Sequence, residues 1–117
     1  MLTAKQVKHQ ISQDPTHLLL HLMSFVDDFR YHQNMDALAE PIPLSEERTD
    51  ALLASTVEYL CHELQLPASP WIEHVPACKD PWFVSGLENL KALALAQSPL
   101  EFRVRKIFVL ANFLDRC

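Results

Sequence analysis

The chain has 117 residues, a net charge of −5 and a single glycine, Gly86, beside eight prolines. Tight hairpins, phosphate-binding loops and dinucleotide-binding turns all use glycine, so this composition argues against β-meanders, barrels and nucleotide-binding α/β folds. The negative charge argues against general nucleic-acid binding, because phosphate contacts require a basic surface. The length suits one domain, and helices separated by prolines remain as the expected architecture.

Three cysteines, Cys61, Cys78 and Cys117, give an odd count without any CxxC pair. This pattern is unlike a disulfide scaffold, so we expect reduced thiols. The first residues lack the apolar segment of a signal peptide, and no apolar run is long enough to span a bilayer. We therefore expect a cytoplasmic protein that has no membrane partner.

The first forty residues predict two helices and one further helical turn. Residues 3–11 suit a short polar helix, and a longer helix is expected over residues 15–32, with Asp14 at its N-cap and Pro15 at its first position. The additional turn is expected within residues 34–40. The longer helix is amphipathic, and its apolar arc consists of Leu18, Leu19, Leu22, Met23, Phe25, Val26 and Phe29.

A third helix is predicted over residues 45–64, with Ser45 as its N-cap. Its apolar positions have the spacing of a core-facing helix: Leu53, Val57, Leu60, Cys61 and Leu64. Prolines then make residues 65–84 a turn-rich connection, with one helical turn expected after Ser69. Large aromatic side chains in such a connection, beginning with Trp71, usually fasten it to the core.

The next helix is expected over residues 86–97, after a capping box formed by Ser85 and Glu88. It is apolar on almost all sides, so we expect it to be the central helix of the fold. Together the segments predict an all-α protein, a single compact helical bundle of four to six helices. Residues 1–117 would form one domain with its Pro-rich connection at about residues 65–84.

The last twenty residues are locally basic. A second capping box at Ser98 predicts a helix over residues 99–106, in which Glu101 and Arg105 form an i,i+4 ion pair. Residues 107–111 suit a helix or a strand, and both alternatives stay open. One further helical turn is expected over residues 112–116.

Two histidines and a carboxylate raise the question of a metal site. His17 and His21 lie one turn apart on one helical face, a spacing that can chelate zinc or nickel, and Asp28 follows on the same stripe. Because that stripe is the polar side of the helix and no further ligand is fixed locally, we expect solvent-facing side chains. We expect no metal and no other cofactor.

No catalytic motif is present in the sequence. It contains no HExxH, GxSxG or P-loop pattern, and no glutamate is followed by histidine three residues on, as a di-iron bundle requires. Cys61 and His62 are adjacent and therefore diverge on a helix. We expect a protein that is not an enzyme. The alternative is a small enzyme whose site is assembled from distant residues such as His62, Cys78 or the Asp27–Asp28 pair.

The C-terminal third resembles a family of small uncharacterised bacterial proteins. The likeness rests on residues 81–83, 87–92 and 98–109, in which Trp-Phe precedes a helix and a Ser-Pro…Phe-Arg-x-Arg-x-Ile-Phe-Val segment. Residues 23–30 are similar to the family as well. Relatives join this segment to a helix-turn-helix, as regulators and antitoxins do. This chain has no recognisable helix-turn-helix, so the resemblance implies an interaction or regulatory module that does not bind DNA by itself.

Arginine beside aromatic residues is typical of protein interfaces, and the C-terminal segment has this composition. The candidate partner-binding residues are Trp82, Phe83, Phe102, Arg103, Arg105 and Lys106. The alternative is structural: the two arginines would tie the tail to Trp82 and Phe83 by packing and cation–π contact. The apolar surface of the helices at 15–32 and 86–97 further predicts self-association or a constitutive protein partner.

Overall fold

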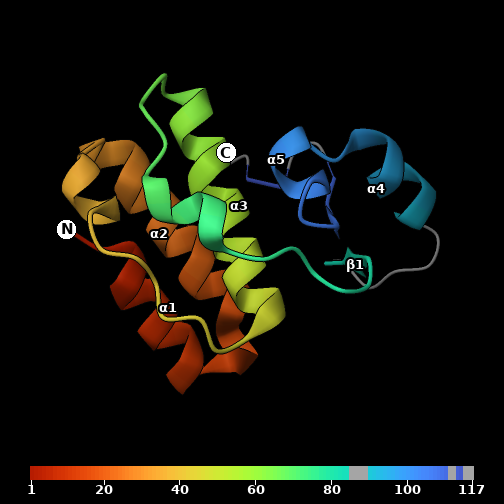
Figure 1. Ribbon diagram of the computed structural model, residues 1–117, viewed down its shortest axis with the longest axis horizontal. Coiled ribbons are helices and arrows are strands. Elements are labelled where there is room, and N and C mark those ends of the chain that lie inside the picture. The colour runs from red at the N-terminus through yellow and green to blue at the C-terminus, as the bar shows by residue number, and fades with distance from the viewer. Residues whose placement is uncertain (85–89, 111–112, 115–117) are drawn as a thin grey trace.

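A computed structural model of the chain describes residues 1–84, 90–110 and 113–114. Within these residues the α-helices are α1 (Ala4–Gln13), α2 (Leu18–His32), α3 (Glu47–Glu63), α4 (Lys91–Gln97) and α5 (Leu100–Arg103). Short 3-10 segments are η1 (Pro15–His17), η2 (Met35–Leu38) and η3 (Pro70–His74), and the strands are β1 (Trp82–Phe83) and β2 (Ile107–Phe108). Figure 1 shows α1 and α2 on one side of α3 and the C-terminal elements on the other. The prediction of an all-α compact bundle with a Pro-rich connection is confirmed.

The helix α1 begins in a capping box that the sequence analysis missed. The Thr3 hydroxyl accepts from the Gln6 backbone N–H at 3.1 Å, and the Gln6 side chain accepts from the Thr3 N–H at 2.9 Å. Two of the otherwise unpaired donors of the first turn are thereby satisfied. The helix places Val7, Lys8 and Ile11 on its buried face.

The segment η1 starts at Pro15 as expected, and the helix α2 follows it. The C-cap of α2 is Gln33, which has a φ of 48°. Its buried face is narrower than the predicted arc and consists of Leu22, Phe25, Val26 and Phe29. Leu19, which the arc includes, is exposed instead, as is its neighbour Leu20. Asp14 does precede the helical segment, but its carboxylate makes no capping hydrogen bond to the backbone.

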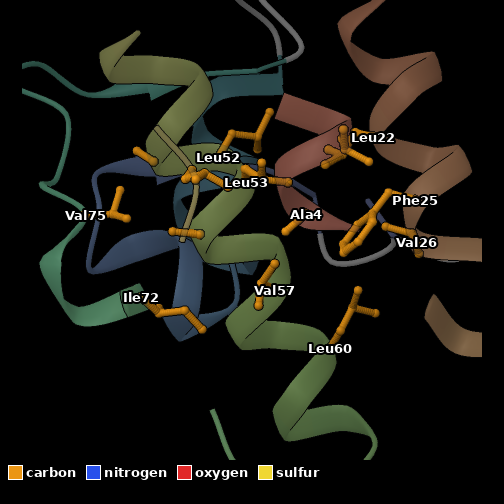
Figure 2. Packing of buried hydrophobic residues seen from close by; sticks show 14 of the residues in the cluster. Ala4, Leu22, Phe25, Val26, Leu52, Leu53, Val57, Leu60, Ile72 and Val75 are labelled. Carbon is orange, nitrogen blue, oxygen red and sulfur yellow. The ribbon is translucent and has the colours of Figure 1, made fainter. Parts of the chain in front are cut away.

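The central helix is α3, not the helix predicted over residues 86–97. Every residue from 51 to 57 is buried, and α1, α2, α5 and η3 all contact this helix. Figure 2 shows α3 between Ile72 and Val75 on one side and Phe25 and Val26 of α2 on the other. Alanine and serine within the buried run allow the neighbours to approach closely, which a helix with several neighbours requires.

The helix α4 is peripheral. Among its seven residues only Ala94 is buried, whereas Leu93 and Leu95 are 44% and 49% exposed. The alternating leucines and alanines that predicted burial on all sides therefore leave apolar surface uncovered. The capping box predicted at Ser85 and Glu88 lies outside the described residues.

Two further predicted caps, Ser45 and Ser98, are also wrong. The helix α3 begins after Glu46, and the Asp50 carboxylate accepts from the backbone N–H groups of Ser45 and Glu46 at 2.9 and 3.1 Å. The Ser45 hydroxyl instead accepts from the Lys8 ammonium at 2.7 Å. Ser98 likewise does not cap α5, because its hydroxyl accepts from the Val109 N–H at 2.8 Å and donates to the Ala94 carbonyl oxygen at 2.6 Å.

The strands β1 and β2 form a two-residue parallel ladder, with Trp82 opposite Ile107 and Phe83 opposite Phe108. The strand alternative for residues 107–111 is thus correct for its first two residues, while β1 was not predicted. The helix expected over 99–106 is shorter, because the chain turns after Arg103 and passes Lys106 with a φ of 60°. The turn expected over 112–116 lies mostly outside the described residues. We call β1, α4, α5 and β2 the C-terminal lobe.

Candidate functional site

The predicted partner-binding residues divide into buried and exposed groups. Phe102 is fully buried, with ring centroids 6.1 Å from Tyr59 and 5.9 Å from Phe113. Such packing makes it a core residue that fastens α5 to α3. It does not lie on the surface where a partner would meet it.

Arg105 is also buried, at 7% exposure. Its guanidinium donates to Glu58 Oε1 at 2.9 Å, to the Glu101 carbonyl at 3.0 Å and to the Ile72 carbonyl at 3.3 Å. Its Nε has no hydrogen-bond partner in the described part of the chain. The residue therefore joins the C-terminal lobe to α3 and η3, which is the geometry of a structural tie, although the contacts are not those expected with Trp82 and Phe83.

The expected side-chain pair between Glu101 and Arg105 is not formed. The Glu101 carboxylate lies 2.6 Å from Nδ1 of His62, at the end of α3. Together with the Glu58–Arg105 pair, this contact gives two polar links between α5 and α3.

Trp82 and Phe83 are half-buried at the start of the C-terminal lobe. The Arg48 guanidinium lies 5.5 Å from the Trp82 ring centroid, and the Lys91 ammonium lies 5.3 Å from that of Phe83. These are cation–π distances. The Phe83 ring also stacks on Phe108, with centroids 5.2 Å apart, so the strand pair carries an aromatic layer.

Arg103 and Lys106 are the members of the predicted set that are exposed. Arg103 donates to the Ala96 carbonyl oxygen at 2.9 Å, which places a cation at the C-terminal end of α4, where the helix dipole favours it. Lys106 donates to the Lys79 carbonyl oxygen at 3.3 Å. Both remain accessible to a partner.

The sequence analysis missed an apolar cavity of about 320 Å³ between the start of α2 and the C-terminal lobe. It is lined by Leu19, Val84, Ala94, Phe108, Leu110 and Phe113, together with Val109. Leu93 and Leu95 lie on α4, which forms part of the wall, and α5 adds exposed Leu100 and Val104. The all-round apolar pattern of residues 86–97 is the signal that the sequence offers, and it predicts burial instead of a cavity wall.

A larger depression of about 540 Å³ runs along α1. Its two lysines are engaged, because Lys5 Nζ lies 2.9 Å from Glu40 Oε2 and Lys8 Nζ lies 2.8 Å from Asp50 Oδ1. Size alone does not make this depression a site, and nothing in its lining converges on a ligand.

Asp14, His17 and His21 form a cluster at the junction of α1 and α2. An Asp14 carboxylate oxygen lies 2.9 Å from Nδ1 of His17 and 3.2 Å from Nε2 of His21. These contacts lower the pKa of Asp14. Asp28 lies elsewhere and accepts from the Leu2 backbone N–H at 2.8 Å. Among the described residues no group of three or more histidine, cysteine or acidic side chains is arranged to hold a metal ion.

Cys61 and Cys78 are buried, and burial raises the pKa of both thiols. A raised pKa disfavours the thiolate, which is the nucleophilic form. Cys78 donates its backbone N–H to the Arg105 carbonyl oxygen, while His62 binds Glu101 and Asp28 binds Leu2. The distant residues considered for an enzyme site thus contact different neighbours, and Cys117 lies outside the described residues.

Comparisons with protein-family models, curated proteins and solved structures find no match to this chain. No helix in the described ranges is both long and apolar enough to cross a membrane.

Proposed function

We propose that this protein is a non-catalytic interaction module that binds a protein partner through the exposed side of its C-terminal lobe. The observation that carries the proposal is the uncovered apolar surface of α4 and α5, where Leu93, Leu95, Leu100 and Val104 are exposed, together with the apolar cavity that Ala94 of α4 helps to line. Exposed apolar surface on neighbouring elements is typical of protein-binding sites.

The attachment of the lobe supports this function. Arg105 bonds to Glu58, Glu101 binds His62, and the Arg30 guanidinium donates to the Leu114 carbonyl oxygen at 2.6 Å. The first two contacts hold the lobe against α3, and the third binds α2 to the chain beyond β2, so the exposed face of the lobe is organised before a partner arrives. A pre-organised surface loses less conformational entropy on binding.

The resemblance of the C-terminal segment to small bacterial proteins supports the same class. Relatives that carry this segment behind a helix-turn-helix suggest a cytoplasmic regulator, antitoxin-like in acting through a protein partner. In this proposal Arg103, Lys106, Trp82 and Phe83 lie at the partner surface, while Phe102 and Arg105 support it from within.

Affinity capture from an extract of the host tests the proposal. The bait is the wild-type protein, compared with the double variant Leu93→Asp/Leu95→Asp and with Leu44→Asp. Leu44 is a matched control because it is an equally exposed leucine, at 54%, in the segment before α3. Circular dichroism verifies that each bait is folded.

We expect one protein to be captured by the wild type and by Leu44→Asp and to be lost with the double variant. The interaction is then reconstituted with the purified partner. Equal capture by all three folded baits, or capture of nothing by the wild type, would contradict the proposal.

A further inference from the structure

We infer that the cavity between α2 and the C-terminal lobe binds a small, uncharged hydrophobic molecule of about ten non-hydrogen atoms. This ligand site goes beyond the proposed function, because the molecule fills the cavity itself and the exposed leucines of α4 and α5 remain for the protein partner. Three properties of the cavity carry the inference: the side chains of its wall, the pairing of its backbone polar groups, and its volume.

The described side chains in the wall of the cavity are all apolar. They belong to Leu19, Val84, Ala94, Phe108, Val109, Leu110 and Phe113. Ala94 and Val109 are each 3% exposed, whereas Leu19 is 44% exposed, so the lining includes both surface and interior residues. A charged ligand would lose its water here without gaining a hydrogen bond from these side chains. The wall therefore favours an uncharged hydrophobic molecule.

The backbone polar groups on the α4 side of the wall are paired through one serine. The Ser98 hydroxyl accepts from the Val109 N–H at 2.8 Å and donates to the Ala94 carbonyl oxygen at 2.6 Å. Ser98 is itself buried. The hydroxyl thus satisfies polar groups of two wall residues that would otherwise favour a water molecule in the cavity.

The backbone groups on the strand side of the wall pair with one another. The Phe108 carbonyl oxygen accepts from the Val84 N–H at 3.2 Å, and the Leu110 carbonyl oxygen accepts from the Phe113 N–H at 3.0 Å. A water molecule in a buried site needs about two to four polar partners. Because these wall groups already have partners, a hydrophobic molecule is a better occupant of the cavity than ordered water.

Two aromatic rings keep the cavity from closing. Phe108 stacks on Phe83, with ring centroids 5.2 Å apart. The Phe113 ring centroid lies 5.9 Å from that of Phe102, which is fully buried. Rings that are fixed by their neighbours cannot easily move into the empty space, and a site that is formed before binding loses less conformational entropy.

The volume of the cavity sets the size of the ligand. It is about 320 Å³, at the lower end of the usual range for ligand pockets, roughly 300–1,000 Å³. Engineered apolar cavities of about 150 Å³ stay dry and bind benzene. A molecule moderately larger than benzene, such as naphthalene, therefore suits this cavity.

A naphthalene titration followed by NMR tests the site. The methyl resonances of Leu19, Val84, Val109 and Leu110 report on the cavity, and the concentration dependence of their shifts gives the dissociation constant. The matched control ligand is 1-naphthoate, which has the same two rings and adds a negative charge. Circular dichroism verifies that each protein in the titrations is folded.

Two pairs of variants locate the bound molecule. Ala94→Leu fills part of the cavity, and Ala92→Leu makes the same change at an exposed position of α4 outside the described lining. Leu19→Asp places a charge in the wall, and Leu20→Asp places it on the next residue, which is 64% exposed and outside the described lining. Because Leu19 is already exposed, Leu19→Asp keeps the test valid if Ala94→Leu disturbs folding.

We expect naphthalene to shift the resonances of the cavity residues and to bind the wild type, Ala92→Leu and Leu20→Asp with closely similar affinity. Its affinity should fall at least about tenfold in Ala94→Leu and in Leu19→Asp, and 1-naphthoate should bind the wild type at least about tenfold more weakly. No shift at the cavity, equal binding of the two ligands, or undiminished binding to either folded cavity variant would overturn the inference.

The ligand site and the proposed function can fail separately. The titration contains no protein partner, so a failure of affinity capture leaves its outcome unchanged. Conversely, a protein that does not bind naphthalene can still capture a partner that Leu93→Asp/Leu95→Asp loses. In that case the ligand site is wrong and the proposed function stands.

Discussion

Arg105 shows how one buried side chain holds the C-terminal lobe in place. Its guanidinium donates to the Glu58 carboxylate on α3, to the Ile72 carbonyl oxygen in η3 and to the Glu101 carbonyl oxygen on α5. Charge-assisted hydrogen bonds of this kind are stronger than neutral ones, and a planar guanidinium can serve several acceptors at once. Arg103, two residues earlier, has the same chemistry but lies on the surface.

Replacing Arg105 with alanine should therefore lower the free energy of unfolding by about 1–3 kcal/mol, because Glu58 and two carbonyl groups lose their donor. Arg103→Ala should cost less than about 1 kcal/mol, since its single carbonyl contact is exposed to water. Urea unfolding of the two variants measures the difference. A loss that is equal for both, or larger for Arg103→Ala, would contradict the structural role of Arg105.

The stability that Asp14 contributes should depend on pH. Contacts with His17 and His21 lower its folded-state pKa below the ordinary value of 3.8. A carboxyl group with a lowered folded pKa adds stability above its unfolded pKa, and this stability is lost as the pH falls through the folded pKa.

The wild type should therefore melt at a higher temperature than Asp14→Asn at pH 6, and the difference should shrink as the pH falls below the ordinary carboxyl pKa of 3.8 and through the lowered folded-state pKa. Thermal melts of both proteins across this range provide the measurement. A difference that grows toward acid pH would show that the carboxylate contacts are not stabilising.

At the scale of elements, a buried ion pair joins α1 to α3. Lys8, at 1% exposure, donates to the Pro43 carbonyl oxygen and the Ser45 hydroxyl. Its ammonium also lies 2.8 Å from Asp50 Oδ1, an ion-pair contact that does not have hydrogen-bond geometry. The same carboxylate binds the N–H groups before α3 through its other oxygen, so one cluster fixes a helix start and a helix pair.

Lys8→Met should lower the free energy of unfolding by about 3–5 kcal/mol, because it leaves the Asp50 charge buried without its partner. Lys5→Met is the control on the same helix. Its pair with Glu40 is exposed, and such pairs contribute about 0–1 kcal/mol. Chemical denaturation of both variants gives the comparison, and an Lys8→Met cost no larger than that of Lys5→Met would contradict the importance of the pair.

The elements that could be predicted from the sequence are those with a long regular pattern. The helices α2 and α3 have more than three turns each, so their apolar periodicity and flanking prolines located them within a few residues. The position of α4 could not be predicted in the same way. An alternation of leucine and alanine is compatible with a buried helix and with a helix on the surface. Only the tertiary contacts determine that Leu93 and Leu95 are exposed.

The site was partly predictable for a similar reason. Arg103 and Arg105 have the same local pattern, and only Glu58, far away in the chain, distinguishes the buried arginine from the exposed one. The two-residue pairing of β1 with β2 depends on a parallel contact that has no local signature. The cavity joins residues of α2 to the C-terminal lobe, so no single segment could reveal it.

On the scale of the whole molecule, the three N-terminal helices and the C-terminal lobe have different roles in the proposed function. The helices α1, α2 and α3 supply most of the core. Figure 1 shows α4 and α5 on the far side of α3 from α1 and α2, and Leu93, Leu95, Leu100 and Val104 of this part of the chain are exposed. Polar links through Arg105 and His62 connect the two parts, and Arg30 of α2 binds the chain beyond β2. Such an arrangement presents a fixed surface instead of one that must fold on binding.

Photo-crosslinking in living cells tests the proposed surface most directly. A photoreactive phenylalanine analogue is placed at position 95 in the exposed face of the lobe, or at position 44 as the control, and crosslinked products are identified by mass spectrometry. The proposed function predicts one dominant heterologous protein crosslinked from position 95 and not from position 44. No product from position 95, or the same products from both positions, would contradict a partner-binding role for the C-terminal lobe.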